Sequence, residues 1–221
     1  MAKKAKRYWD LVLTDWDGTL HDSMMLYYGS AIKIFKHFGL KPPSLETYRE
    51  EISSDYMESF YWKNGVPRDA PMDVLNKINF RFFRKHWNEA RLHNGTKDFL
   101  RTCQELQIPV VIVSAGATSV IMHKLVGSRI NNFIDDIRAD IRGNKTSILQ
   151  EILGQRGIAP SRSLFIEDSC DGIESGKEIG IKTVGCTYGF HTPERIIATK
   201  PDLVIDDVRQ MVNVIKNGRL L

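Results

Sequence analysis

Two carboxylates separated by one residue, Asp15 and Asp17, are the first residues of the chain whose spacing could support chemistry. They follow the apolar run at 11–13, and Gly18 directly after them lets the chain turn sharply. Acids placed together at the end of a buried strand repel each other and lose solvation. A bound divalent cation would relieve both costs, because hard cations take oxygen ligands. The alternative is an Asx-type turn with one exposed acid.

Polar residues at three later places could complete such a site. Ser114 follows an apolar run, Glu167 and Asp168 follow another, and Lys145 opens a segment with helical spacing. In parallel α/β sheets, ligands bind beyond the carboxyl ends of the strands. Taken singly, each place has an ordinary alternative: a strand-end hydroxyl, a solvated helix lysine, or a helix N-cap with its acidic neighbour. Their occurrence together in one chain favours a shared site.

Short apolar runs alternate with helical patterns and predict the elements that would position these residues. The runs that predict strands lie at 11–13, 109–113, 163–166, 182–186 and 203–205, with a poorly defined strand near 133–139. Apolar residues recur at helical spacing at 99–106, 120–125, 148–153, 172–179 and 208–215. Alternating strands and helices predict a parallel α/β sheet with right-handed crossovers.

The segment from 24 to 93 contains no convincing strand and carries repeated helix-break signals. Gly39 and Gly65 are expected to end helices, and Ser44 with Thr47 is expected to cap one. This helical insert interrupts the sheet directly after the first strand. We therefore expect a core of residues 1–22 and 94–221, with a helical cap of residues 23–93.

The chain resembles the haloacid dehalogenase-like hydrolases, of the phosphoglycolate phosphatase and β-phosphoglucomutase type with a helical cap. The motifs that carry the resemblance are D-W-D-G-T-L-H-D-S at 15–23, V-S-A-G at 113–116, G-N-K-T at 143–146 and E-D-S-C-D-G-I at 167–173. They occur in the family's order, and the first and last are specific. The resemblance implies a Rossmann-like parallel sheet core with an inserted all-α cap. It also implies an enzyme, a phosphoric monoester hydrolase.

The resemblance implies catalytic roles for the two aspartates. Asp15 would be the nucleophile that forms an aspartyl-phosphate. Asp17 would act as general acid toward the leaving oxygen and then as general base toward water. The residues that would bind phosphoryl oxygens are Ser114, Ala115, Gly116 and Lys145.

Magnesium is the cofactor that the resemblance implies. Asp15, the main-chain oxygen of Asp17, and Asp168 would hold the ion. Glu167 and Asp171 would lie near the metal or behind its ligands, and for Asp171 a plain first-turn acid is an open alternative.

The substrate is expected to be a small phosphorylated metabolite, phosphoglycolate-like or a sugar or nucleotide phosphate. A phosphomutase is one alternative, although Tyr27 stands where the phosphoglucomutase branch has a histidine. A non-catalytic binding module on the same fold is the other alternative. We expect His21 to be a surface histidine that could touch substrate. The cap aromatics expected to form the cap core or line a pocket are Tyr27, Tyr28, Tyr56, Phe60, Tyr61 and Trp62.

Composition excludes several other classes of protein. A net charge of +4 over 221 residues is too weak to indicate a nucleic-acid partner, and the basic residues at 3–7 are expected to form a solvated tail. Asp10 interrupts the apolar run near the start, so we expect no signal peptide, and no run is long enough for a membrane span. Three widely spaced cysteines match neither a disulfide framework nor a zinc pattern. We therefore expect a cytoplasmic protein, a monomer or a weak homodimer.

Overall fold

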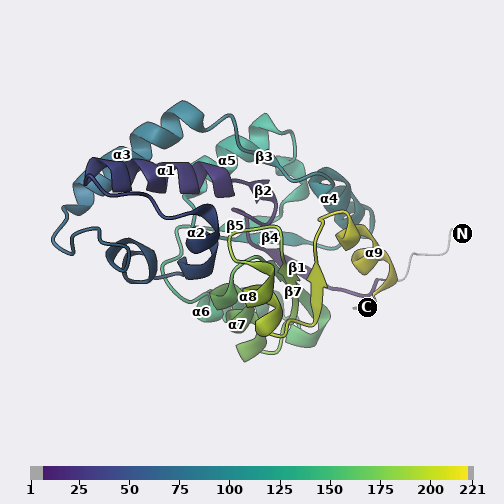
Figure 1. Cartoon of the computed structure of the whole chain (residues 1–221). Helices are drawn as coiled ribbons and strands as arrows, with labels where there is room; N and C mark the ends of the chain where they lie inside the picture. Colours follow the sequence, from purple (N-terminus) through teal and green to yellow (C-terminus); the bar gives the residue numbers. More distant parts are fainter. Residues whose placement is uncertain (1–6, 219–221) are drawn as a thin grey trace, which may run out of the picture.

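The strand β1 (Leu11–Thr14) lies in the middle of a six-stranded sheet in which every pairing is parallel. The computed structural model describes residues 7–218, and its strand order is β5-β4-β1-β6-β7-β8 (Figure 1). The remaining strands of this sheet are β4 (Val110–Val113), β5 (Asp136–Arg138), β6 (Ser163–Glu167), β7 (Lys182–Cys186) and β8 (Leu203–Ile205). The strand order reverses at β1, and such a reversal is where parallel α/β sheets bind ligands.

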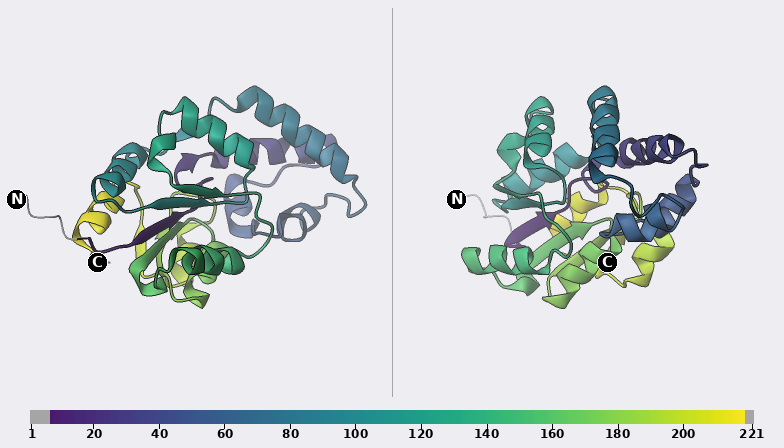
Figure 2. Two further views of the ribbon diagram at one scale, coloured as in Figure 1. Left: turned by 180° about the vertical axis from the view of Figure 1, so that it is seen from behind. Right: turned by 90° about the vertical axis from the view of Figure 1, so that its left-hand side faces the viewer.

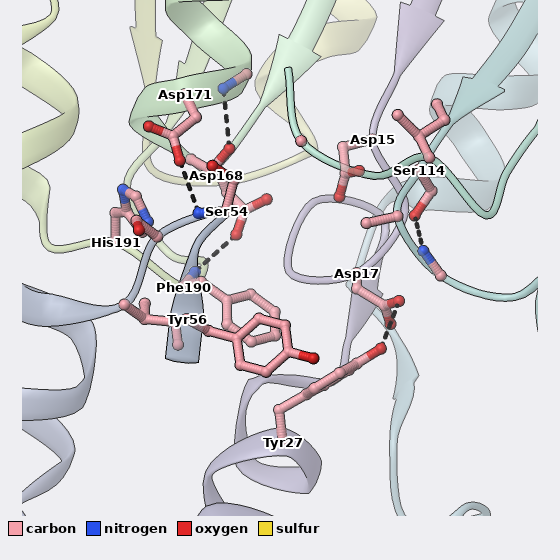
Figure 3. Close-up of a pocket in the computed structure, with 18 of the residues that line it drawn as sticks. Asp15, Asp17, Tyr27, Ser54, Tyr56, Ser114, Asp168, Asp171, Phe190 and His191 are labelled. Atoms are coloured by element: carbon pink, nitrogen blue, oxygen red, sulfur yellow. Dashed lines mark hydrogen bonds between the residues drawn. The ribbon is translucent and has the colours of Figure 1, made fainter. Parts of the chain in front are cut away.

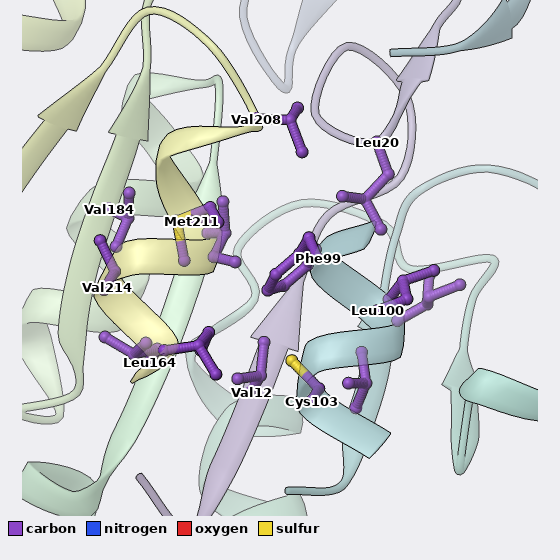
Figure 4. Close-up of a cluster of buried hydrophobic side chains, with 14 of the residues drawn as sticks. Val12, Leu20, Phe99, Leu100, Cys103, Leu164, Val184, Val208, Met211 and Val214 are labelled. Atoms are coloured by element: carbon purple, nitrogen blue, oxygen red, sulfur yellow. The ribbon is translucent and has the colours of Figure 1, made fainter. Parts of the chain in front are cut away.

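Helices cover both faces of the sheet, which explains why its strands are continuous apolar runs. Within β1, Val12 belongs to one buried cluster and Leu11 and Leu13 to another, because successive side chains point to opposite faces. Figure 4 shows side chains of α4 and α9 meeting over Val12, whereas α6 packs on the other face. The helices of the core are α4 (Thr96–Glu105), α5 (Thr118–Gly127), α6 (Thr146–Arg156), α7 (Cys170–Glu178), α8 (Pro193–Ala198) and α9 (Gln210–Asn217).

The cap is helical and lies at the end of the molecule away from α9 (Figures 1 and 2). Its helices α1 (Met24–His37) and α3 (Met72–His86) pack against each other. The shorter elements are α2 (Leu45–Glu51) and a turn of π-helix, Met57–Trp62. The Ser44 side chain accepts a hydrogen bond from the Thr47 amide, so the predicted cap of α2 is confirmed.

A two-stranded antiparallel sheet joins the two ends of the cap. It pairs β2 (His21–Asp22) with β3 (Arg91–Leu92). The expectation of no strand between 24 and 93 is therefore wrong for β3. Two residues are too short to show a strand period in the sequence, and the pairing joins segments about seventy residues apart.

His21 is fully buried, which corrects the expectation of a surface histidine. Its ring stacks on Trp16 with centroids 5.3 Å apart and meets the Trp87 ring at 5.6 Å. The β2–β3 pairing carries His21 between these two tryptophans, which a polar residue in isolation does not reveal.

The predicted fold class, a Rossmann-like parallel sheet with an inserted helical cap, is confirmed. The division into residues 1–22, 94–221 and 23–93 stays a prediction. The helix α8 lacked a clear apolar pattern and was not expected. Most of the basic tail lies outside the described residues, and within residues 7–218 no helix is long and apolar enough to cross a membrane.

Candidate active site

The ends of three neighbouring strands bring the predicted site residues to one cavity between the core and the cap. Asp15 follows β1, and the strands on either side of β1 are followed directly by Ser114 and Asp168. The cavity has a volume of about 550 Å³. All the predicted site residues line it, namely Asp15, Asp17, Ser114, Ala115, Gly116, Lys145, Glu167, Asp168 and Asp171.

A buried lysine holds two of the acids together. The Nζ atom of Lys145, at the start of α6, donates to Asp15 Oδ1 at 2.6 Å and to Glu167 Oε2 at 2.7 Å. Burial raises the pKa of Asp15 well above its ordinary value, although the Lys145 charge opposes this shift. Burial alone would lower the pKa of Lys145, but Asp15 and Glu167 raise it. The ammonium is therefore a fixed positive charge beside the predicted nucleophile.

Three buried carboxylates form a set of oxygens suited to a metal ion. Asp15, Glu167 and Asp168 each offer an oxygen, and these atoms lie within 4.8 Å of one another. Burial, followed by the charge of Glu167, raises the pKa of Asp168 to about 7. One lysine does not balance three acids, and hard cations such as Mg²⁺ prefer oxygen ligands. The donor set therefore fits the predicted cofactor.

The turn after β1 requires a glycine on two grounds. Gly18 has a φ of +83°, in the left-handed region. A Cβ atom at Gly18 would also lie 2.1 Å from Asp168 Oδ2. Thr19 follows and donates from Oγ1 to Asp168 Oδ1 at 2.7 Å, so the turn also orients this acid.

The side chain of Asp17 faces the cap. Its Oδ1 accepts from Ser23 Oγ at 2.7 Å and lies 3.1 Å from His21 Nδ1. Its Oδ2 accepts from the Tyr27 hydroxyl at 3.1 Å (Figure 3). Because Tyr27 belongs to α1, the predicted general acid is tied directly to the cap.

The loop after β4 places a hydroxyl at the cavity. The Gly116 amide donates to Ser114 Oγ at 3.1 Å, which fixes the serine side chain. Asp140 accepts from the amide and hydroxyl of Thr118 and so holds the start of α5. Ala115 lies between these groups in the same loop.

Asp171 lies in the first turn of α7 and contacts the cap. Its Oδ2 accepts from the Ser54 amide at 2.7 Å (Figure 3). Its side chain does not belong to the cluster of Asp15, Glu167 and Asp168. A role for Asp171 near the metal therefore stays a prediction.

The loop after β7 contributes residues that sequence reasoning missed. The Phe190 amide donates to Asp168 Oδ2 at 2.7 Å, and His191 Nδ1 accepts from the Cys170 amide at 3.0 Å. This loop also follows the carboxyl end of a strand, so the rule that located the other site residues could have found it.

The cap contributes a second group of missed residues, Tyr48, Asn79 and Phe83. Helical spacing marks a buried face but does not say whether that face covers a core or a cavity. The predicted cap aromatics divide accordingly. Those lining the cavity are Tyr27, Tyr56 and Tyr61, and those that do not are Tyr28, Phe60 and Trp62.

Comparison with known proteins agrees with this fold. The family model described as "Haloacid dehalogenase-like hydrolase" matches residues 12–186. A phosphoglycolate phosphatase of Pseudomonas putida is 26% identical over 212 residues, covering 91% of this chain and 78% of the relative. One from Photobacterium profundum is 25% identical, covering 91% and 93%. The crystal structure of a predicted phosphoglycolate phosphatase from Haemophilus somnus has a TM-score of 0.77 at 19% identity, covering 94% and 98%.

The chain belongs to the haloacid dehalogenase-like hydrolases. The resemblance noted in the four motifs is thereby confirmed, as is the prediction of an enzyme, a phosphatase of this family. The particular substrate, the metal and the role of each site residue are matters for proposal.

Proposed function

We propose that this hydrolase is a magnesium-dependent phosphatase that acts on a small phosphomonoester through an aspartyl-phosphate intermediate. One observation carries the proposal: the buried Asp15 carboxylate sits 2.6 Å from the Lys145 ammonium and beside Glu167 and Asp168. A positive charge and a metal-binding oxygen set next to a carboxylate suit phosphoryl transfer, which depends mostly on positioning and charge stabilisation.

Each proposed step uses a group at the cavity. An Asp15 oxygen attacks phosphorus, the bond to the leaving oxygen breaks, and Asp17 gives that oxygen its proton. Asp17 then takes a proton from water, the water oxygen bonds to phosphorus, and the bond to Asp15 breaks. Inorganic phosphate leaves and both aspartates return to their starting state.

Other groups would hold the phosphoryl oxygens during both steps. These are the Ser114 hydroxyl, the amides of Ala115 and Gly116, and the Lys145 ammonium, all of which line the cavity. Asp15 and Asp168, with the main-chain oxygen of Asp17, would hold Mg²⁺, which when bound offsets the negative charge of phosphate and acids. A single chain supplies every proposed group, which is consistent with a monomer or a weak homodimer.

The test is phosphate release from p-nitrophenyl phosphate with Mg²⁺ and with EDTA. We expect activity only with the metal, and Asp15→Asn should abolish both turnover and any trapped phosphoenzyme. Asp17→Asn should release about one nitrophenolate per site in a burst and then stall, because asparagine cannot activate water. The exposed neighbour Asp22 offers the control Asp22→Asn, which should retain activity.

Three results would contradict parts of this proposal. Full turnover in the presence of EDTA would show that the enzyme does not require a metal ion. Steady turnover by Asp15→Asn would exclude the covalent mechanism. Isomerisation of a sugar phosphate without phosphate release would indicate a phosphomutase instead.

A further inference from the structure

The cap side of the cavity is walled by aromatic rings. The Tyr27 ring meets Phe83 edge-on at 5.0 Å and Phe190 at 5.3 Å, measured between centroids. Tyr48 lies 6.4 Å from Phe190, and Tyr56 also lines the cavity. Figure 3 shows the rings of Tyr27, Tyr56 and Phe190 near the carboxylates of Asp17 and Asp168. An apolar, flat-sided space therefore opens directly beside the reacting groups.

The hydrogen-bonding groups on this wall are uncharged. Asn79 lines the cavity, and its Oδ1 accepts a hydrogen bond from the Ser30 hydroxyl. Its amide nitrogen has no hydrogen-bond partner within residues 7–218 and is left as a donor. Tyr48 and Tyr61 also line the cavity, and within residues 7–218 their hydroxyls have no hydrogen-bond partner. These groups could pair with the polar edge of a neutral ligand, since a donor or acceptor buried without a partner is costly.

Positive charge is confined to the core side of the cavity. Among the described residues that line it, the lysine and arginine side chains are Lys145 and Arg142. Lys145 is already bonded to two carboxylates, and Arg142 is exposed on the loop three residues before it. The cap residues that line the cavity include no lysine or arginine.

On the cap side of the cavity, a carboxylate on the substrate's alcohol part would therefore be poorly placed, because Arg142 and Lys145 lie on the core side. Beyond the phosphate position it would meet aromatic rings and neutral groups. It would also face the acids Asp17 and Asp171, which line the same cavity. Burying a charge without an opposite partner is strongly unfavourable, and like charges repel. This weighs against a small anionic alcohol such as glycolate.

On the basis of the proposed phosphatase function, we propose that the substrate is a phosphomonoester whose alcohol part carries an uncharged aromatic ring, as in a nucleoside monophosphate. The ring would stack on the cap aromatics, which accept any flat π-face. Its polar edge would pair with Asn79 and the tyrosine hydroxyls. A cavity of about 550 Å³ is large enough, because small-molecule pockets span about 300–1,000 Å³.

The first test compares alkyl phosphates with Mg²⁺ present: benzyl phosphate, uridine 5′-monophosphate, 2-phosphoglycolate and glucose 6-phosphate. The leaving oxygen is an alkoxide in each, so differences report the fit of the alcohol part. We expect kcat/KM for the two aromatic substrates to exceed that for the other two by about tenfold or more. A preference for 2-phosphoglycolate or glucose 6-phosphate would overturn the inference.

The second test changes the wall. Tyr56 is 39% exposed at the cavity, so Tyr56→Ala should fold. We expect it to lower kcat/KM for benzyl phosphate about tenfold while changing that for methyl phosphate by less than about twofold. Phe80→Ala is the matched control, because Phe80 is 66% exposed and does not line the cavity. Equal losses on both substrates would contradict stacking.

A charge placed in the wall gives the converse experiment. Asn79→Lys should raise the rate on 2-phosphoglycolate relative to benzyl phosphate by about tenfold, because the new ammonium would pair with the carboxylate. An unchanged ratio would contradict the inference. Failure of the phosphatase function itself is distinguishable, since p-nitrophenyl phosphate would then show no metal-dependent release either. Release from that ester together with a preference for 2-phosphoglycolate would refute only the aromatic substrate.

Discussion

Replacing Lys145 with methionine should destabilise the fold far more than a typical surface change. Its Nζ atom donates to Asp15 at 2.6 Å and to Glu167 at 2.7 Å, and the side chains of these acids are 8% and 1% exposed. Methionine keeps much of the volume and removes the charge. Two carboxylates are then left buried without their cation, beside a third, Asp168.

The expected magnitude follows from this burial. Removing one partner of a buried ion pair costs about 3–5 kcal/mol, because the remaining charge is left uncompensated. For a chain of this length, 1 kcal/mol shifts the melting temperature by about 2–4 °C, so the fall should be about 6–20 °C. Lys182→Met is the matched control, since Lys182 pairs with Asp202 at 2.7 Å but is 42% exposed. An exposed ion pair stabilises the folded state by only about 0.2–1 kcal/mol, so Lys182→Met should lower the melting temperature much less.

The assay is thermal unfolding of wild type and both variants, first in EDTA and then in excess Mg²⁺. A cation at the acids would supply positive charge where the lysine was lost. The metal should therefore raise the melting temperature of Lys145→Met more than that of wild type. If the two variants Lys145→Met and Lys182→Met lower the melting temperature by the same small amount, the Lys145 ammonium does not offset the charge of these acids. Equal stabilisation of wild type and Lys145→Met by Mg²⁺ would refute the shared-charge argument.

Three further predictions concern other parts of the site. Gly189→Ala would place a Cβ atom 2.2 Å from Asp168 Oδ2, so it should remove most metal-dependent activity. Gly154→Ala should retain activity in the same enzyme assay, because no heavy atom lies within 4 Å of the added Cβ atom. Tyr27→Phe removes one of the donors that hold Asp17 and should lower kcat about tenfold. Tyr28→Phe removes a hydroxyl that donates to the Pro43 carbonyl and should leave kcat unchanged. Equal kcat values for the two variants in steady-state kinetics would contradict a role for the bond between Tyr27 and Asp17. Burial lowers the pKa of His191 to about 3 in the folded protein. Below about pH 6.5 the unfolded state therefore binds more protons than the folded state. The unfolding free energy should fall as the pH drops from about 6.5 toward 3. Denaturant titrations should show a weaker fall for His191→Gln, and parallel curves would contradict this.

Sequence reasoning located the core elements because their signals are local. A strand buried on both faces is a continuous apolar run, as at 110–113, and the run ends where polar residues begin. Gly18 marked the turn after β1 for a similar reason, since its backbone conformation is unfavourable for other residues. The alternation of such runs with helical patterns led to the parallel sheet, and strand ends then pointed to Ser114 and Asp168.

Elements that depend on distant partners were missed or misplaced. The strands β2 and β3 have two residues each and exist because they pair with each other across the whole cap. His21 was expected at the surface, yet that pairing buries it between Trp16 and Trp87. Neither fact has a signature within a short window of sequence.

The sequence by itself determined which residues follow the strands of the sheet and which lysine begins a helix, and hence which acids, hydroxyl and lysine could share a site. Only the tertiary structure decided what each of them touches: Asp17 bonds to Tyr27 of the cap, and Asp171 to the Ser54 amide. It also decided that cap aromatics and Asn79 face the reacting groups while positive charge stays on the core side. The physical reason is that strand ends follow from local hydrophobic patterns, whereas a cavity wall depends on how the cap and the core pack against each other.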